Sequence, residues 1–228
     1  MECLVALPGR RVGILGGTFD PVHLGHLAVA EAAREHLALD TLLFIPAASP
    51  PHKLRAPLAP FADRVAMLRL ALAEHPGFAI SEMERDRPGP SYSIDTLKEL
   101  RQQLGEEARL FFCIGMDAFA EITSWKKYAE LFHYAGFVVV ERPDSGGMAL
   151  ADFIAAELPH FRQGGERAWA EADGPGRIYA LAMPGVPVSS TLVRERAARG
   201  ESLAGLVPGE VAGYIARHGL YRPSTGGR

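Results

Sequence analysis

Two histidines follow a pair of glycines near the start of the chain, in the stretch Gly16-Gly17-Thr18-Phe19-Asp20-Pro21-Val22-His23-Leu24-Gly25-His26. Glycine lacks a Cβ, so backbone N–H groups at such a turn can approach a bound anion closely. An apolar run precedes the stretch and a helix-like run follows it, which predicts a strand, a turn and a helix start, whose free N–H groups favour phosphate. His23 and His26 are three residues apart, so on a helix they share a face and point into the space above the glycine turn.

The same stretch differs from two common phosphate-binding motifs. It lacks the Lys-Ser/Thr pair that follows the second glycine of a P-loop, and it lacks the third glycine of the dinucleotide fingerprint. We expect Asp20 and Pro21 to be the cap and a first-turn residue of the helix. The alternative interpretation is a tight strand-to-helix connection with two surface histidines.

A second corner of this kind lies near the C-terminus, in Val188-Ser189-Ser190-Thr191-Leu192-Val193-Arg194. Ser189 or Ser190 can cap a helix there. The hydroxyls of Ser190 and Thr191 and the forked guanidinium of Arg194 can bind phosphate oxygens. Serines at a helix start are also common as plain caps, so this set alone leaves both interpretations open. Together, the two corners offer two polar helix starts, as a triphosphate requires.

The composition places the chain among globular proteins of a reducing compartment. Of its 228 residues 48% are hydrophobic, enough to bury a core. The formal net charge of −3 gives no general affinity for nucleic acid or an anionic membrane, so neither is expected as a partner. The two cysteines, Cys3 and Cys113, argue against a disulfide framework and suit the cytoplasm. No stretch has the apolar length of a membrane span, and Met1–Arg11 is too short for a secretory signal.

Short apolar runs alternate with helical patterns along most of the chain. This alternation predicts an α/β fold, with a doubly wound, mostly parallel sheet and helices on both faces. Such sheets bind ligands at the carboxyl ends of their strands, where the glycine turn is expected. The expected strands are Val12–Leu15, Leu42–Pro46, Phe78–Met83, Leu110–Gly115, Phe137–Glu141 and Ile178–Met183, and the expected helices are Leu24–Leu37, Phe61–His75, Ser93–Leu104, Ala118–Tyr134, Ala149–Leu158 and Glu210–His218.

We expect three parts along the chain. Residues 1–10 form an N-terminal extension, and residues 11–187 form the main domain, in which 144–176 is a variable insertion. Residues 188–228 form a small C-terminal helical part that carries the second corner. The proline-rich loop Ala47–Pro60 is either a stiff surface connection or a mobile flap that brings Lys53 to a phosphate.

Five ordered motifs together resemble those of the nucleotidyltransferases with an HxGH box, and more narrowly those of the bacterial nicotinate-nucleotide adenylyltransferases. The resemblance runs from Arg11 to about Tyr221, with 144–176 poorly matched, and implies a Rossmann-like fold. The motifs are the glycine turn with His23-Leu24-Gly25-His26, then Pro50-Pro51-His52-Lys53, Pro90-Ser91-Tyr92-Ser93-Ile94-Asp95-Thr96-Leu97, Ile114-Gly115-Met116-Asp117 followed by Trp125, and Ser189-Ser190-Thr191-x-x-Arg194.

The resemblance implies transfer of AMP from ATP to nicotinate mononucleotide, with formation of deamido-NAD and release of pyrophosphate. It implies Mg²⁺ bound mainly through ATP phosphates and water, with no metal ligands from the protein. His23, His26 and Arg194 are implied as catalytic through phosphate contacts, and Lys53 would neutralise phosphate charge. The residues implied in ATP binding are Gly16, Gly17, Thr18, Phe19, His23, His26, Gly115, Asp117, Ser189, Ser190, Thr191 and Arg194.

The resemblance also implies a subsite for the pyridine nucleotide. Trp125 would stack on the pyridine ring, although periodicity alone equally allows a core tryptophan within the helix Ala118–Tyr134. Backbone N–H groups at the helix start and after the tryptophan would receive the carboxylate, around Tyr92, Ser93 and Lys126. Ser93 stands where threonine is commoner in the family, and Lys126 stands where an aromatic residue is frequent.

Other interpretations stay open at this point. They are a phosphopantetheine-type or nicotinamide mononucleotide adenylyltransferase, and a non-catalytic nucleotide-binding sensor. Phosphopantetheine adenylyltransferases tend to be shorter and lack a stretch like Pro90–Leu97, and a sensor would not need two histidines together with Arg194. Assembly into a homo-oligomer is also left open.

Overall fold

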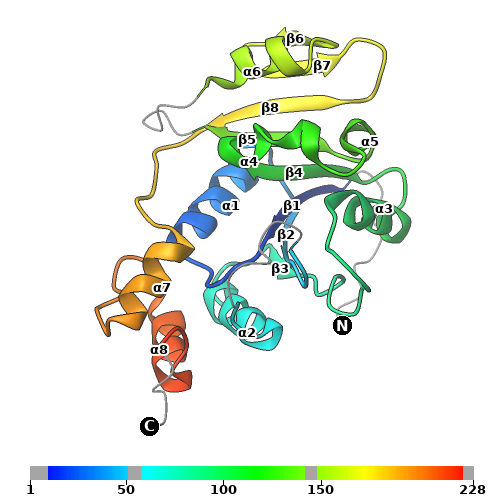
Figure 1. Cartoon of the computed structure of the whole chain (residues 1–228). Coiled ribbons are helices and arrows are strands. Elements are labelled where there is room, and N and C mark those ends of the chain that lie inside the picture. The colour runs from blue at the N-terminus through cyan, green and yellow to red at the C-terminus, as the bar shows by residue number, and fades with distance from the viewer. Residues whose placement is uncertain (1–9, 51–57, 142–147, 223–228) are drawn as a thin grey trace.

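One mixed β-sheet forms the centre of the molecule (Figure 1). The computed structural model describes residues 10–50, 58–141 and 148–222. Within these residues eight strands are ordered β3-β2-β1-β4-β5-β8-β7-β6; β6 and β7 pair antiparallel, and the strands from β3 to β8 in that order run parallel. The strands are β1 (Arg11–Gly17), β2 (Thr41–Pro46), β3 (Phe78–Ile80), β4 (Arg109–Gly115), β5 (Gly136–Glu141), β6 (Phe161–Gly165), β7 (Ala168–Glu171) and β8 (Arg177–Ala182).

Helices cover both faces of the sheet, which confirms the predicted doubly wound arrangement. On one face α1, α2, α7 and α8 bury their apolar side chains, and on the other face α3, α5 and α6 do so. The central strands are therefore buried on both sides, and all six residues of β2 are buried, as a continuous apolar run predicts. The helices are α1 (Leu24–His36), α2 (Phe61–Leu72), α3 (Ser93–Leu104), α4 (Met116–Phe119), the 3₁₀ turn η1 (Ile122–Ser124), α5 (Tyr128–Tyr134), α6 (Leu150–Glu157), α7 (Ser190–Ala198) and α8 (Gly209–His218).

The order of the strands reverses between β1 and β4. From β1 the chain proceeds outward through β2 to β3, and it then returns to place β4 on the other side of β1. The register pairs Gly17 of β1 with Pro46 of β2, and Leu15 of β1 with Cys113 of β4, so the strands end close together. Open α/β sheets bind ligands in the crevice at such a switch point. The glycine turn after β1 thus lies at the expected end of the sheet.

The six predicted strands are confirmed, with small shifts at their ends, but one predicted helix is wrong. Over Ala118–Tyr134 the chain forms the end of α4, then η1, and then α5. Lys127 has φ of 55° between η1 and α5, a left-handed conformation that a right-handed helix cannot contain. Trp125 consequently lies at the end of η1 and outside any helix.

The described part of the expected insertion, residues 148–176, extends the sheet. After α6, strands β6 and β7 form an antiparallel hairpin, and β7 pairs with β8. The strands of this hairpin were not predicted, because four of the five residues of β6 are exposed and two are glycine, so no alternation marks it. The hairpin ends the sheet on the side away from β1 (Figure 1). The expected N-terminal extension 1–10 lies, apart from Arg10, outside the described residues.

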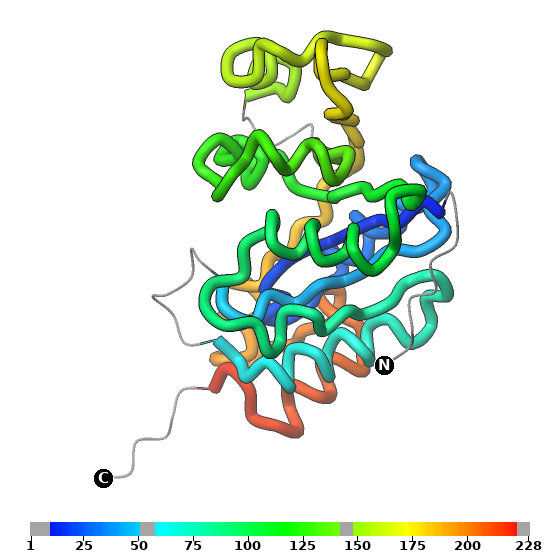
Figure 2. Tube along the Cα trace, turned by 90° about the vertical axis from the view of Figure 1, so that its right-hand side faces the viewer, coloured from blue at the N-terminus to red at the C-terminus, as the bar shows by residue number. Residues whose placement is uncertain are grey.

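The C-terminal helix packs beside α2. Figures 1 and 2 both show α8, in red, next to α2, in cyan. The Tyr214 hydroxyl of α8 donates a hydrogen bond of 2.7 Å to Asp63 of α2. This contact brings the C-terminal part back to the face of the sheet that carries α1. In the part of the chain that is described, no helix is long and apolar enough to cross a membrane.

Candidate active site

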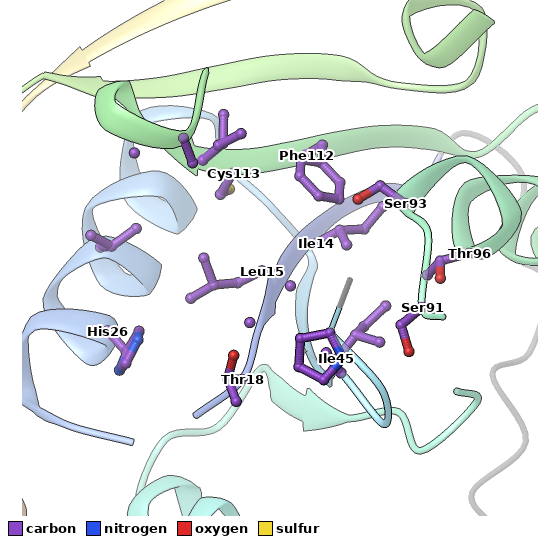
Figure 3. Close-up of a pocket in the computed structure, with 18 of the residues that line it drawn as sticks. Ile14, Leu15, Thr18, His26, Ile45, Ser91, Ser93, Thr96, Phe112 and Cys113 are labelled. Carbon is purple, nitrogen blue, oxygen red and sulfur yellow. The ribbon is translucent and has the colours of Figure 1, made fainter. Parts of the chain in front are cut away.

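A cavity of about 550 Å³ opens at the carboxyl ends of β1 and β4. Figure 3 shows His26 and Thr18 on one side of β1, with Ser91, Ser93 and Thr96 on the other. Its volume lies within the usual range of sites for small molecules. The predicted site residues that line it are Gly16, Gly17, Thr18, His23, His26, Tyr92, Ser93, Gly115, Asp117, Trp125, Lys126 and Ser189.

His23 and His26 lie at the start of α1 and stack on each other. Their ring centroids are 3.7 Å apart and their planes meet at 24°. The backbone N–H of His23 donates to Nδ1 of His26 at 3.2 Å, so the neutral His26 ring carries its proton on Nε2. The predicted shared face is confirmed, because both rings line the cavity beside the glycine turn. The prediction that Asp20 and Pro21 start the helix is wrong, because His23 is the N-cap.

Gly25 leaves room between the histidines for close packing. A Cβ at this position would lie 3.1 Å from the His23 ring and 3.2 Å from Val188 of the second corner. Carbon atoms prefer separations of roughly 3.5–4.0 Å, so a side chain here would push the ring or the corner away. The glycine of the His23-Leu24-Gly25-His26 box is thus required by packing.

Phe19 supports the histidines from beneath the cavity. Its side chain is buried, and its ring meets the His26 ring edge-on, with the centroids 5.0 Å apart. It also contacts Phe44 of β2. Its φ of 48° is unusual for a bulky residue and turns the backbone sharply after Thr18. The cavity is lined by Gly16, Gly17 and Thr18, and Phe19 lies behind them.

The second corner is joined to the first through backbone carbonyls. The Ser190 hydroxyl donates to the carbonyl oxygen of Pro21 at 3.0 Å. The Nη1 of Arg194 donates to the carbonyl oxygen of Asp20 at 2.7 Å. The glycine turn and the second corner are therefore in direct contact, as the expected phosphate site requires.

Ser189 begins α7 and faces the cavity. Its hydroxyl accepts a hydrogen bond from the N–H of Leu192 at 3.1 Å, which selects Ser189 as the cap where the sequence allowed Ser189 or Ser190. Arg194 Nη2 donates to Thr191 Oγ1 at 3.1 Å. Ser190, Thr191 and Arg194 lie beside the cavity and are not among the residues that line it.

A buried arginine beneath the glycine turn was not found from the sequence. The Arg64 side chain, on α2, is only 2% exposed. Its guanidinium donates to the carbonyl oxygens of Thr18 at 2.7 Å, Ala47 at 2.8 Å and Ala59 at 3.2 Å. Burial lowers its pKa, and the negative charge of nearby Asp20 acts in the opposite direction. Arg64 thereby holds together the chain segments that follow β1 and β2.

Asp20 is the second member of this buried group. Its carboxylate is 1% exposed and accepts hydrogen bonds from the N–H of Ala59 at 3.2 Å and the hydroxyl of Tyr221 at 2.8 Å. Burial and the Asp20 charge raise the pKa of Tyr221 well above its ordinary value, so the phenol stays a donor. Asp20 thus links the glycine turn to the C-terminal end of the described chain.

The end of β4 forms another wall of the cavity. No atom of the described residues outside the chain neighbours lies within 4 Å of where a Cβ of Gly115 would be, so the strand end is open to a ligand. Asp117 lies in the first turn of α4 and lines the cavity. Cys113 is 2% exposed, and burial raises the pKa of its thiol to about 12, so this part of the wall is uncharged.

The opposite wall is built from the start of α3 and the turn after η1. Ser91 donates its N–H to the carbonyl of Ser49 at 2.8 Å and accepts the N–H of Ser49 on its hydroxyl at 3.2 Å. These bonds hold the segment that follows β2 beside the start of α3. Tyr92 is the N-cap of α3, and no side chain in the described residues caps this helix.

Trp125 contacts both the core and the cavity. It is half-buried, and its ring meets Phe112 edge-on at 6.3 Å and 84°. It also lines the cavity, so its stacking on a pyridine ring stays a prediction. Lys126 follows it along the same wall. Lys53 lies outside the described residues, so its contact with phosphate stays a prediction.

Comparison with known proteins assigns the chain to a family. A family described as Cytidylyltransferase-like matches residues 14–196. A Geobacter metallireducens protein named "Probable nicotinate-nucleotide adenylyltransferase" is 44% identical over 217 residues, which cover 92% of this chain and 98% of that protein. A Thermus thermophilus protein of the same name is 43% identical over 212 residues, which cover 93% of this chain and 100% of that protein.

A solved structure shares the fold at low identity. It is the nicotinic acid mononucleotide adenylyltransferase of Plasmodium falciparum complexed with NaAD, which superposes with a TM-score of 0.72 at 16% identity and covers 93% of this chain and 97% of that one. With two relatives above 40% identity over nearly their whole length, this chain belongs to the nicotinate-nucleotide adenylyltransferase family of cytidylyltransferase-like proteins.

Proposed function

We propose that this protein transfers AMP from ATP to nicotinate mononucleotide, which yields nicotinate adenine dinucleotide (deamido-NAD) and pyrophosphate. The observation that carries the proposal is one continuous cavity with a phosphate-type wall and an aromatic wall. The first wall holds His23 and His26 beside the glycine turn, and the second holds Tyr92 and Trp125. The names of the Geobacter and Thermus relatives support the same reaction.

The chemistry needs positioning more than it needs a base. The attacking group is the phosphate of the mononucleotide, whose second pKa is about 6, so it is largely ionised at neutral pH. One of its oxygens bonds to the α-phosphorus of ATP, while the bond from that phosphorus to the bridging oxygen of the β-phosphate breaks. Pyrophosphate leaves with the electron pair of that bond. Catalysis then consists of aligning the two phosphates and stabilising the charge that develops.

The two corners are placed to perform this stabilisation. His26 offers an Nε2 donor, and His23 stacks on it at the start of α1. Arg194 and the start of α7 lie against the same turn, where they would hold the departing pyrophosphate. Gly16 and Gly17 line the cavity at the end of β1, where the missing Cβ atoms let a phosphate approach the backbone closely.

The remaining walls fit the two nucleosides. Gly115 and Asp117 would contact the adenosine, with the Asp117 carboxylate accepting hydrogen bonds from ribose hydroxyls. Trp125 would stack on the pyridine ring. The uncapped start of α3, at Tyr92 and Ser93, offers backbone N–H groups to the carboxylate of nicotinate.

Magnesium fits this arrangement as a partner of the substrate. The described residues contain no group of three or more His, Cys, Asp or Glu side chains that could hold a metal ion. Mg²⁺ prefers oxygen ligands and retains water, so the triphosphate oxygens would be its main ligands. Bound there, the ion would neutralise part of the phosphate charge, and His23, His26 and Arg194 of the protein would neutralise the rest.

One coupled assay tests the proposed function. Purified protein is incubated with ATP and Mg²⁺ and with either nicotinate mononucleotide or nicotinamide mononucleotide, and pyrophosphate is measured. We expect release of pyrophosphate with a clear preference for the acid, together with deamido-NAD as the second product. A preference for the amide contradicts the choice of substrate, and ATP binding without turnover on either nucleotide points to the sensor.

Replacing Trp125 with alanine is expected to raise KM for nicotinate mononucleotide by about tenfold and to leave KM for ATP nearly unchanged, because stacking on a base is worth roughly 1–3 kcal/mol. Steady-state kinetics with each substrate varied in turn measure the effect. The matched control is Trp169→Ala, which removes the tryptophan of β7 in the distal hairpin. Equal increases in both KM values would assign Trp125 to the core alone.

A further inference from the structure

Lys126 places a cation on the wall of the cavity beside Trp125. Its Nζ lies 3.0 Å from Asp95 Oδ2 and 4.4 Å from the centre of the Tyr92 ring. Both partners belong to the start of α3, so Lys126 bridges the two segments that form this wall. Of the described residues that line the cavity, Lys126 is the one lysine or arginine.

One member of this ion pair belongs to the cavity lining. Lys126 lines the cavity, whereas Asp95 does not. The ammonium group has three donors, and Asp95 accepts from one of them. The electron-rich face of Tyr92 attracts the cation and holds it beside the start of α3 without adding a negative charge.

The acidic groups on the cavity wall do not cancel this cation. Glu84 is 6% exposed, its Oε1 accepts the Thr96 hydroxyl at 2.5 Å, and it lies 3.7 Å from the guanidinium of Arg87. Asp117 belongs to α4, at the end of β4. A ligand group beside Trp125 and Tyr92 therefore meets Lys126 as the nearest cationic side chain of the cavity lining.

The acid and amide nucleotides differ in the substituent on the pyridine ring, which carries a negative charge in the acid and none in the amide. The nicotinate carboxylate is an anion, and the carboxamide is neutral with nearly the same shape. Two backbone N–H groups can pair with both oxygens of the carboxylate, whereas the carboxamide offers one oxygen and an NH₂ donor, so the backbone favours the acid and a cation adds to that preference. A lysine in the cavity lining attracts the anion and gives the amide no comparable gain.

We propose that the ammonium of Lys126 is a specificity-determining group that selects the nicotinate form over the nicotinamide form. This inference rests on the proposed function, since it concerns the substrate of the same cavity. It assigns the selectivity to a side chain of this protein, in addition to the backbone of α3. Tyr92 and Asp95 are positioning residues, because they hold the ammonium in place.

The variant Lys126→Met tests this assignment, because it keeps the length of the side chain and removes the charge. The side chains of Lys126 and Asp95 are 44% and 39% exposed, and such pairs contribute little to stability, so the fold is expected to persist. We expect kcat/KM for the acid to fall about tenfold, mainly through KM, and kcat/KM for the amide to change less than about twofold. Lys126→Arg is expected to restore most of the preference.

Lys127→Met is the matched control. Lys127 is the next residue, is 52% exposed, and pairs with Glu130 at 2.9 Å outside the cavity lining. The ratio of kcat/KM for the acid to kcat/KM for the amide is expected to be the same in Lys127→Met as in the wild type. Added salt should lower the ratio in the wild type and leave it unchanged in Lys126→Met, since screening acts on an exposed charge.

The outcomes separate this inference from the proposed function. If the wild type prefers the acid and Lys126→Met keeps the same ratio, the assignment of Lys126 is overturned and the proposed function stands. If the wild type shows no preference for the acid, the proposed substrate is overturned, and the assignment falls with it. An equal decrease of the acid-to-amide ratio in Lys127→Met and Lys126→Met also overturns the assignment, because the effect would then come from the net charge and not from the position of Lys126.

Discussion

Replacing His26 with alanine is expected to lower kcat by about a hundredfold, the usual cost of removing one preorganised donor from a site of developing charge. The Nδ1 of His26 accepts the N–H of His23, which directs the proton of the ring to Nε2. That donor lies at the glycine turn, where the α-phosphate would be attacked. The loss should appear in kcat more than in KM for ATP, because the charge on phosphate is redistributed only as the new bond forms.

His36→Ala provides the control on the same helix. His36 lies in the last turn of α1 and is exposed, so this variant removes an imidazole far from the cavity. Both variants are compared by thermal unfolding, since His26 also stacks on His23 and contacts Phe19. A kcat of His26→Ala within about threefold of the wild type, in a folded protein, would remove His26 from the mechanism.

The sequence was most informative where one local pattern determined the structure. The apolar run before Gly16 and the helical pattern after Leu24 predicted a strand, a turn and a helix, and β1 and α1 confirm them. The alternation of such units predicted the parallel sheet, and parallel strands must end at a common edge. The meeting of the two corners follows from this topology, because β1 and β8 both belong to the parallel part of the sheet.

Prediction failed where the pattern was mixed. Around Trp125 the apolar spacing continues through a break in the helix, where Trp125 is extended and Lys127 is left-handed. A lysine in this conformation carries no signal in the sequence, unlike a glycine. Four of the five residues of β6 are exposed and all four of β7 are half-buried, so the hairpin lacks the alternation by which a half-buried strand is recognised.

The buried polar residues beneath the glycine turn, Arg64 and Asp20, could not be predicted for a different reason. Arginine is almost never fully buried unless it is paired, so Arg64 on a helix pattern is naturally assigned to the surface. Its partners are carbonyl oxygens of Thr18, Ala47 and Ala59, which any sequence could offer. Side-chain-to-backbone contacts across the fold leave no local pattern, and Tyr221 reaches Asp20 from the far end of the chain for the same reason.

These contacts explain how the candidate site is kept in shape without a ligand. Arg64 holds the loop after β1 from below, Asp20 is fixed by two donors, and Arg194 is fixed in turn by the carbonyl of Asp20. The guanidinium of Arg194 is thereby oriented before phosphate arrives. Preorganisation of this kind reduces the ordering that binding and catalysis would otherwise require.

Replacing Arg194 with alanine is therefore expected to lower the activity about as much as replacing His26 with alanine. We expect kcat/KM for ATP to fall by about a hundredfold, because a charge-assisted hydrogen bond from the guanidinium to phosphate is lost. Two of its five donors contact Asp20 and Thr191, so three remain for phosphate oxygens. Arg194→Lys keeps the charge and loses the fork, so it should recover only part of the activity.

Inhibition by pyrophosphate distinguishes the role of Arg194 from that of His26. If Arg194 holds the departing pyrophosphate, the inhibition constant of pyrophosphate should rise at least about tenfold in Arg194→Ala. In His26→Ala the same constant should stay close to the wild-type value. The matched control is Arg196→Ala, since Arg196 lies two residues further along α7 on another face of the helix and is near Glu201. If the inhibition constant of pyrophosphate is unchanged in a folded Arg194→Ala variant, Arg194 only supports the structure around Asp20. Binding of the leaving pyrophosphate would then be assigned to the start of α7 alone.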